Sequence, residues 1–369
     1  MKQYRGRLAP SPTGYLHLGH ARTFWVAWQR ARAAHGKLIF RNEDLDYQRC
    51  RPEFVKAMYE DLRWLGLDWD EGPDISSQSS KGGQRGDPGF SSDHSGHGDD
   101  DRSDHGGPFG PYSQSERRSF YLDAWRKLRD SGLIYPCTCS RKDLERALSA
   151  PHEPLRGAEL DEPLQAEPSQ QIAEGLQDSC GTAAPGGETN TTQPGAAAVQ
   201  SAADDELPYP GTCREKIGTA KDYDSPAGVS WRFKVPDGET IPFNDGYFGR
   251  QEFVAGRDFS DFLLWRRDDI PAYQLAVVVD DATMQITEIV RGADLLKSTA
   301  RQLLLIRALG YSTPAYFHCP LLRDEKNVRL AKRHDALSLR ALRAQGADPE
   351  ILREKFADEV EWSQGSVKP

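Results

Sequence analysis

The stretch RLAPSPTGYLHLGHAR, residues 7–22, decides the predicted fold. It follows a strand-like segment, QYRGRLA, and leads into a segment whose apolar residues repeat at the spacing of one helical face: Ala21, Phe24, Trp25, Trp28 and Ala31. A second strand-like segment, KLIFRNED, comes next. Strand, helix and strand in this order predict a βαβ unit, in which the loop and the helix N-terminus lie at the carboxyl edge of a parallel sheet.

The remaining apolar patterns extend this unit to an α/β fold. Further helices are expected over 51–66, which Pro52 opens and Gly66 closes, and over 293–310 and 349–360. Gly36 is expected to cap the first helix. Strands are expected over 229–236, 261–267, 272–282 and 284–292. These elements predict a nucleotide-binding core with a parallel sheet and a smaller inserted lobe.

Two acidic segments of low complexity separate the patterned regions. Residues 76–107 carry a net charge of −3, and residues 151–208 carry −10. Segments of this composition do not bury enough apolar surface to order themselves, so both are predicted to be disordered. The chain has 47 basic and 56 acidic residues and a net charge of −9, so the rest of it carries +4. A mildly basic core is compatible with a phosphate-rich partner.

The composition also indicates the cellular compartment of the protein. The N-terminal MKQYRGRLA lacks the apolar run of a signal peptide, and no segment approaches the ~18 apolar residues of a membrane span. Six cysteines in 369 residues are too few for a disulfide scaffold. We therefore expect a cytoplasmic protein without a membrane partner, and we expect it to be a monomer.

The opening loop has the composition of a phosphate site. Gly14 allows a tight turn, while Pro10 and Pro12 stiffen the backbone. His17 and His20, three residues apart, fall on one side of the first helical turn. A helix N-terminus attracts anions, and two imidazoles beside it can donate hydrogen bonds to a phosphate in a charge-rich transition state.

These motifs resemble those of class I aminoacyl-tRNA synthetases, in particular the glutamyl branch. His17-Leu18-Gly19-His20 matches the HIGH box of that family, and RNEDLD at 41–46 resembles its R-x-E-D-x-D strand end. GPYSQSERRSFY at 110–121 and EIVRGADLL at 288–296 resemble two further segments in the same order. The resemblance covers most of the chain outside the two acidic segments. It implies a Rossmann-like core of the HUP type that uses ATP, with Mg²⁺ accompanying the nucleotide.

By resemblance, six residues form a pocket for L-glutamate: Arg7, Ala9, Ser11, Glu43, Tyr273 and Arg291. The two arginines are expected to bind the substrate carboxylates, because a planar guanidinium matches a carboxylate. Tyr273 is expected to donate from its hydroxyl, and Glu43 to hold the α-ammonium group. Ala9 and Ser11 are expected to line the same pocket.

The family carries a second ATP-binding signature, the mobile KMSKS loop, which corresponds here to NVRLAKRHDALS. Lys332 retains the second lysine, whereas Arg329 replaces the first lysine and Ala331 replaces the serine. The resemblance implies that Lys332 stabilises the phosphates during catalysis. Three residues are expected to complete the ATP site with it: His17, Gly19 and His20.

Four residues point to a structural zinc site. Cys137-x-Cys139 with a distant Cys213 is a spacing typical of zinc ligands. Together with Tyr209, this set resembles the zinc site of the synthetases that attach glutamate to queuosine. Residues 140–208 separate its two halves here, and a loop of that length adds roughly a few kcal/mol to the cost of closure. Cys180 is the alternative fourth ligand.

We expect three parts in the chain. Residues 1–135 and 251–369 are expected to form the two halves of the core, and residues 136–250 the zinc-bearing acceptor lobe. Only 37 residues follow Lys332, too few for the anticodon-binding domain of full glutamyl-tRNA synthetases. The resemblance therefore implies ATP-dependent activation of glutamate and its transfer to queuosine in the anticodon loop of tRNA(Asp), a base presented from a single-stranded loop.

Three alternatives stay open at the level of sequence. One is a truncated synthetase that charges tRNA(Glu). Another is a non-catalytic amino-acid-binding relative, which the changes at Arg329 and Ala331 favour. The third is a nucleotidyltransferase, since the HxGH box is shared across the wider fold. The expected pocket of Arg7, Glu43 and Arg291 argues against the third.

Overall fold

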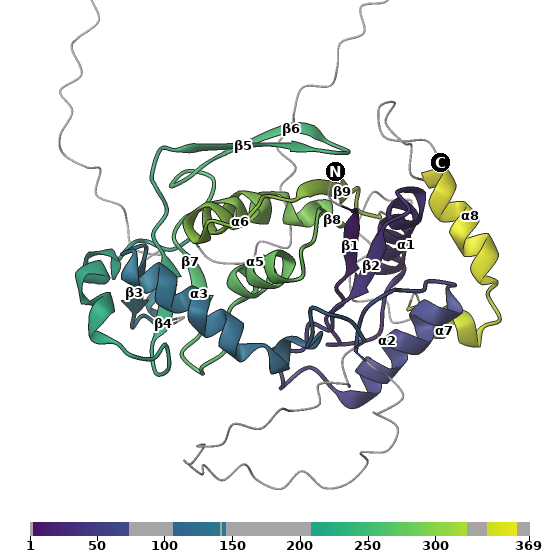
Figure 1. The fold of residues 1–369 in the computed structure, drawn as a ribbon, viewed down its shortest axis with the longest axis horizontal. Coiled ribbons are helices and arrows are strands. Elements are labelled where there is room, and N and C mark those ends of the chain that lie inside the picture. Colours follow the sequence, from purple (N-terminus) through teal and green to yellow (C-terminus); the bar gives the residue numbers. More distant parts are fainter. Residues whose placement is uncertain (1–2, 74–105, 141, 145–207, 323–337, 360–369) are drawn as a thin grey trace, which may run out of the picture. The chain divides into compact units, whose positions relative to one another are not determined.

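The opening stretch forms the predicted βαβ unit in the computed structural model of the chain, which describes residues 3–73, 106–140, 142–144, 208–322 and 338–359 (Figure 1). Strands β1 (Arg5–Leu8) and β2 (Lys37–Phe40) pair in parallel, and α1 (Leu18–Ala33) connects them. On the predicted apolar face of α1, Ala21, Trp25 and Ala31 are buried, whereas Phe24 and Trp28 are partly buried. The loop at 9–17 therefore leaves the carboxyl end of a parallel strand.

Gly36 does not cap α1 in the predicted way. The left-handed backbone at this helix end belongs to His35, with φ of 47°. Gly36 serves a different need, because a Cβ at this position would lie 2.5 Å from the Tyr4 carbonyl oxygen. That oxygen accepts the Lys37 N–H at 2.9 Å, so the close approach of the two strands excludes a side chain here.

A four-stranded sheet continues from β1. Strands β8 (Glu288–Gly292) and β9 (Ala315–Cys319) pair in parallel, and the hairpin of β5 (Thr240–Asp245) and β6 (Gly249–Val254) adds to β9, in the order β6-β5-β9-β8. The Thr287 N–H donates to the Arg5 carbonyl at 2.9 Å, which joins the start of β8 to β1. The α/β class with a parallel sheet is thus confirmed.

Residues 272–282 were expected to form a strand, and that prediction is wrong. They form helix α5 (Tyr273–Thr283), in which every residue from Gln274 to Asp281 is buried. A helix buried on all sides has no polar face, so its sequence shows a continuous apolar run, as a buried strand does. In Figure 1, α5 lies beside α6 (Leu296–Leu309), and the two helices contact each other.

The other predicted helices are present. They are α2 (Pro52–Trp64), α6 and α8 (Pro349–Glu359). Gly66 and Gly310, just after α2 and α6, have φ of 81° and 70°, as helix-ending glycines do. The structure adds α7 (Leu339–Ala344) and α3 (Arg118–Asp130), which the sequence analysis did not predict.

A second sheet is antiparallel and has the order β3-β4-β7. Its strands are β3 (Ile134–Cys137), β4 (Ser230–Phe233) and β7 (Phe262–Trp265), and the last two were predicted. Trp125 of α3 packs edge-on against Trp231 of β4, with ring centroids 4.9 Å apart. This packing anchors the sheet on the same hydrophobic cluster that holds α5 and α6.

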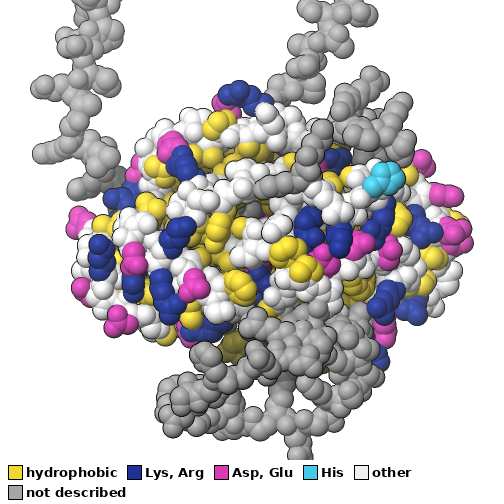
Figure 2. Space-filling view, in the orientation of Figure 1, with side chains coloured by type: hydrophobic (Ala, Val, Ile, Leu, Met, Phe, Trp, Pro, Cys, Tyr) yellow, Lys and Arg dark blue, Asp and Glu magenta, His cyan; other side chains and the backbone are white. Residues whose placement is uncertain are grey.

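On the surface shown in Figure 2, Lys and Arg side chains are interspersed with Asp and Glu. Among the described helices, none combines the length and the apolar character needed to cross a bilayer. The predicted disorder of 76–107 and 151–208 falls almost entirely outside the described residues.

Candidate active site

The loop after β1 ends at His17, the N-cap residue of α1. Its backbone is extended, with φ of −91° and ψ of 159°, and no side chain caps the helix. The first turn of α1 contains no acidic residue. A Cβ at Gly19 would meet no atom within 4 Å, so the backbone of this turn can be approached closely. These features suit an anion at the positive end of the helix.

The two predicted histidines lie together at this helix end. The rings of His17 and His20 have centroids 6.1 Å apart, and His20 is exposed. His20 also packs near Phe24, at 6.4 Å between ring centroids. Two imidazoles at this spacing can both donate hydrogen bonds to one polyanionic ligand.

Lys332 lies outside the described residues, as do Arg329 and Ala331. The described chain resumes at Ser338, which forms a β-bridge with His17. The adjacent Leu339 N–H donates to the Leu16 carbonyl at 2.7 Å. The end of the KMSKS-like segment and the residue after it therefore lie beside the predicted ATP site.

The residues predicted to bind glutamate converge from four elements. Arg7 lies on β1, Glu43 follows β2, Tyr273 begins α5 and Arg291 lies on β8. Tyr273 is exposed, and its hydroxyl is within electrostatic range of the other three. The Ser11 hydroxyl lies 3.4 Å from a Glu43 carboxylate oxygen. The Glu43 N–H donates to the Pro10 carbonyl, next to Ala9, at 3.1 Å.

A network of buried ion pairs contacts this cluster. Arg41, which is fully shielded from solvent, donates to Glu43 at 2.9 Å and to Asp281 at 2.6 Å. Burial opposes ionisation of Asp281, but Arg41 and Arg7 outweigh it and lower the pKa of this carboxyl. Burial also raises the pKa of Glu43, against the influence of Arg41. Arg41 thus favours the ionised form of Glu43 that an ammonium ligand requires.

The network extends to Asp280, which accepts hydrogen bonds from Arg117 at 2.6 Å and Gln114 at 2.8 Å. Asp280 and Asp281 were missed at the level of sequence, because the run around them was assigned to a strand. Helical spacing was the available signal: Tyr273, Val277 and Asp281 are four residues apart and share a helix face.

Arg291 differs from Arg7 and Arg41 in its partners. It donates to His318 Nε2 at 3.1 Å, Gln302 Oε1 at 2.8 Å and Thr299 Oγ1 at 2.7 Å. No ion pair to Arg291 occurs within the part of the chain that the structure describes. Neutral groups therefore hold its guanidinium directly, which suits a receptor for a carboxylate.

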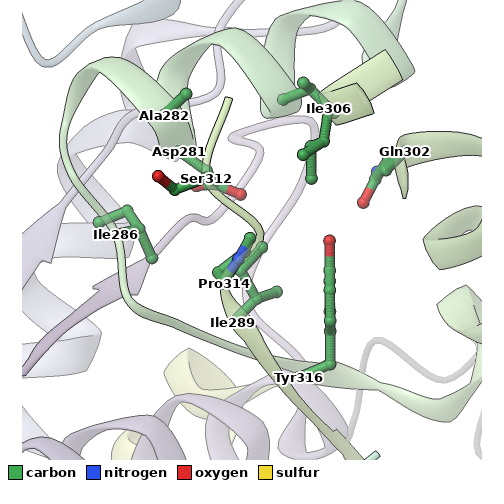
Figure 3. Close-up of a pocket in the computed structure, with 10 residues that line it drawn as sticks. Asp281, Ala282, Ile286, Ile289, Gln302, Ile306, Ser312, Pro314 and Tyr316 are labelled. Carbon is green, nitrogen blue, oxygen red and sulfur yellow. The ribbon is translucent and has the colours of Figure 1, made fainter. Parts of the chain in front are cut away.

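A small cavity of about 10 Å³ lies behind this cluster (Figure 3). In Figure 3 the Tyr316 side chain extends toward Gln302 and Ile306 of α6, with Asp281 and Ile286 on the other side. A volume of this size holds about one water molecule, so this cavity is not the amino-acid pocket.

The predicted zinc ligands come together at the end of β3. The sulfurs of Cys137, Cys139 and Cys213 lie within 4.8 Å of one another. The Tyr209 hydroxyl is 3.5 Å from Cys137 Sγ and 3.9 Å from Cys139 Sγ, and it accepts the Cys213 N–H at 2.8 Å. The alternative ligand, Cys180, lies outside the described residues.

The donor set fits a tetrahedral zinc ion. Two sulfurs bound at ~2.3 Å in a tetrahedron lie about 3.8 Å apart, and Cys139 and Cys213 are separated by 3.6 Å. Burial raises the pKa of the Cys213 thiol, but hydrogen bonds with the Thr138 backbone, Tyr209 and Cys139 outweigh it and bring this pKa to about 6. A thiol of that pKa is readily available as the thiolate that binds metal.

Comparison with known proteins decides the family. The model for the catalytic domain of class I tRNA synthetases (E and Q) matches residues 3–174 and 199–363. The chain belongs to this family. It is 41% identical to a Glutamyl-Q tRNA(Asp) synthetase of Symbiobacterium thermophilum over 94% of this chain and 83% of the relative. The enzyme of the same name from Nitratidesulfovibrio vulgaris is also 41% identical, over 93% of this chain and 82% of the relative.

Solved structures agree with this assignment at the level of the fold. A glutamate tRNA ligase from Elizabethkingia meningosepticum superposes with a TM-score of 0.60 at 24% identity, covering 90% of this chain and 52% of the ligase. The class I tRNA synthetase fold therefore accounts for the parallel sheet and the helix N-terminus described above.

Proposed function

We propose that this class I tRNA synthetase activates L-glutamate with ATP and transfers it to the queuosine base of tRNA(Asp). The observation that carries the proposal is the 41% identity, over nearly the whole chain, to relatives named for this activity. The four charged and tyrosine residues of the pocket converge near Ser11, whose loop leads to the helix N-terminus at His17. This supports the proposal, since a dicarboxylic amino acid and a triphosphate need adjacent sites.

Glutamate recognition follows from the charges of the pocket. Arg291 and Arg7 bind its two carboxylates, and the Tyr273 hydroxyl donates to one of them. Glu43, which accepts a hydrogen bond from Arg41 at 2.9 Å, binds the α-ammonium group. Ala9 and Ser11 line the pocket at the end of β1, where Ser11 contacts Glu43. Each charge of the amino acid thus meets its opposite.

In the activation step, an oxygen of the glutamate α-carboxylate attacks the α-phosphorus of ATP. The new O–P bond forms as the bond to the β-phosphate oxygen breaks, which gives glutamyl-adenylate and pyrophosphate. His17 and His20 stabilise the developing phosphate charge beside Gly19, and Lys332 acts with them. Mg²⁺ accompanies the nucleotide, and positioning of the two substrates supplies much of the remaining acceleration.

In the transfer step, a hydroxyl of the queuosine cyclopentene ring attacks the carbonyl carbon of the adenylate. The ester bond forms, the mixed anhydride breaks, and AMP leaves. RNA-binding proteins reach bases of this kind in single-stranded loops, where the base can be turned outward. We assign no side chain as the general base for this step.

The lobe beside the second sheet holds a structural zinc ion in this proposal. Cys137, Cys139, Tyr209 and Cys213 supply its ligands. The Arg232 guanidinium lies 3.9 Å from the centre of the Tyr209 ring and packs against it. The ion joins residues on either side of the segment 145–207, and it fixes the lobe without taking part in the chemistry.

The proposal is tested by incubating the chain with ATP, radiolabelled glutamate and two purified RNAs, queuosine-containing tRNA(Asp) and tRNA(Glu). Label on tRNA(Asp), absent when the tRNA carries unmodified guanosine, is the expected result. Label on tRNA(Glu) instead would make the chain a synthetase of the charging type. Absence of both labels and of glutamate-dependent ATP–pyrophosphate exchange would favour a non-catalytic relative.

A further inference from the structure

A buried histidine holds the guanidinium that the proposed function assigns to the substrate carboxylate. His318 of β9 and Arg291 of β8 are register partners across the parallel pair. The Arg291 Nε–H points to His318 Nε2 at 3.1 Å. A guanidinium only donates, so His318 must accept at Nε2. The imidazole is therefore neutral, with its proton on Nδ1, and this tautomer follows from the hydrogen-bond pattern.

Asp245, at the end of β5, fixes that tautomer. Its Oδ2 lies 2.6 Å from His318 Nδ1, and both side chains are fully buried. The carboxylate is itself anchored, because Oδ1 accepts the N–H groups of Tyr247 at 3.0 Å and Phe248 at 2.9 Å. The His318 ring is also packed in place by Tyr316, with ring centroids 6.2 Å apart. Asp245 thus has one orientation, and His318 has one tautomer.

The other two acceptors of Arg291 come from α6. Thr299 and Gln302, three residues apart, face β8 and bond the two terminal nitrogens of the guanidinium. Gln302 is oriented in turn by its hydrogen bond to Gln274 at 3.0 Å. Three neutral acceptors therefore fix the plane of Arg291, while two of its five N–H donors are left for a ligand.

We propose that Asp245 and His318 are positioning residues that hold Arg291 as the receptor for a substrate carboxylate. This inference rests on the proposed function, since it assumes that glutamate is the substrate. Arg7 and Arg41, in contrast, pair with Asp281. A histidine orients Arg291 without neutralising it, so the guanidinium keeps its attraction for an incoming carboxylate. A carboxylate in place of His318 would orient Arg291 equally well but would compete with the substrate.

Asp245→Asn tests the chain of contacts. An asparagine amide that donates to His318 Nδ1 moves the imidazole proton to Nε2, where it opposes the Arg291 Nε–H. We expect the KM for glutamate in ATP–pyrophosphate exchange to rise roughly 10–100-fold, the range for one hydrogen bond to a charged group. The KM for ATP stays within about twofold, and kcat changes little, because the lost interaction is made in the ground state and the transition state alike.

A second variant guards against a folding defect. In His318→Gln, the side-chain oxygen can still accept from Arg291 but no longer depends on Asp245 for a tautomer, so we expect a rise in the glutamate KM smaller than that of Asp245→Asn. The matched control is Tyr59→Phe, which removes a buried hydroxyl of α2 that has no hydrogen-bond partner among the described residues. Its KM for glutamate stays unchanged.

Three outcomes decide the matter. A selective rise in the glutamate KM of both variants, with circular dichroism and melting like the control, supports the positioning role. An unchanged glutamate KM in either folded variant, or an equal rise in the KM for ATP, overturns it while leaving the proposed function intact. A wild-type chain without glutamate-dependent exchange contradicts both.

Discussion

Arg41 is the side chain on which the buried network most depends. It bonds Asp281 and Glu43, and its Nε lies 3.8 Å from Asp280. Removing one partner of a buried ion pair leaves the others desolvated without compensation, so we expect Arg41→Met to lower the free energy of unfolding by about 3–5 kcal/mol. Urea denaturation followed by circular dichroism measures this loss.

The matched control is Arg49→Met, which removes an arginine that pairs with Asp46 at 2.6 Å while remaining largely exposed. Water screens exposed pairs, so the expected loss is about 0–1 kcal/mol. Equal losses in the two variants would contradict the structural importance of the buried network.

His20 belongs to the proposed phosphate site rather than to the core. Its side chain is exposed at the N-terminal end of α1, so His20→Ala should leave the melting temperature nearly unchanged. We expect the ATP–pyrophosphate exchange rate to fall roughly 10²–10³-fold, the cost of removing one donor to transition-state charge. His35→Asn, just past the other end of the helix, provides the control, because asparagine tolerates the left-handed backbone of that position. A near-normal rate in His20→Ala would remove this histidine from the mechanism.

At this scale, sequence reasoning found the residues that carry a motif and missed those that support them. The structure brings Arg7, Glu43 and Arg291 into one cluster, as the family resemblance implied. The contact between Asp245 and His318 was not foreseen, because 73 residues separate them and neither belongs to a recognised signature. Contacts of this kind depend on strand order, which a single sequence does not supply.

Among the elements, α5 shows why a continuous apolar run in the sequence can be mistaken for a strand. Its residues 276–279 read Ala-Val-Val-Val, a run with high strand propensity, yet they pack on all sides as a helix. The missed β5–β6 hairpin did have a signal in Gly249, which follows the three-residue loop 246–248 and has a left-handed φ of 66°. Tertiary packing overrode propensity in the first element, and turn chemistry was overlooked in the second.

The backbone on each side of residues 74–105 is held in place by its own hydrogen bonds. On one side, the Phe40 N–H donates to the Glu71 carbonyl at 2.7 Å; on the other, the Asn42 N–H donates to the Tyr112 carbonyl at 2.9 Å. A Cβ on Gly106 would lie 2.9 Å from the Gly72 oxygen, so the two flanks meet.

Deleting residues 76–103 should therefore preserve the fold, because a shorter connection costs less closure entropy. We expect a melting temperature within about 2 °C of wild type, since a ΔΔG near zero shifts it little, and unchanged ATP–pyrophosphate exchange. Differential scanning calorimetry and the exchange assay check the two points. Loss of exchange in a folded deletion variant would show that the segment takes part in catalysis.

The cysteine cluster makes a prediction about metal content. Cys137→Ser should lower the zinc bound per chain, measured by elemental analysis after purification without chelator, because a serine hydroxyl is a poor replacement for a thiolate. Cys50→Ser is the control, since Cys50 is not part of the cluster. An equal zinc content per chain in wild type and Cys137→Ser would contradict the assignment of Cys137 as a zinc ligand.

For the whole molecule, the sequence motifs were sufficient to predict the fold class, and the family match confirms it. Net charge was less informative, because the chain carries −9 overall while its patterned part carries +4. The parts that act on glutamate, ATP and RNA are distant in sequence: Arg7 and Arg291 are 284 residues apart but meet through the β1–β8 contact. The fold is what assembles the proposed site.

The most direct test of the central claim is to locate the glutamate on the RNA. After incubation with ATP and glutamate, tRNA(Asp) is digested to nucleosides and analysed by mass spectrometry. We predict that glutamate remains attached to the queuosine nucleoside and that the 3′-terminal adenosine is unmodified. Glutamate found on the terminal adenosine, with queuosine unchanged, would contradict the proposed reaction.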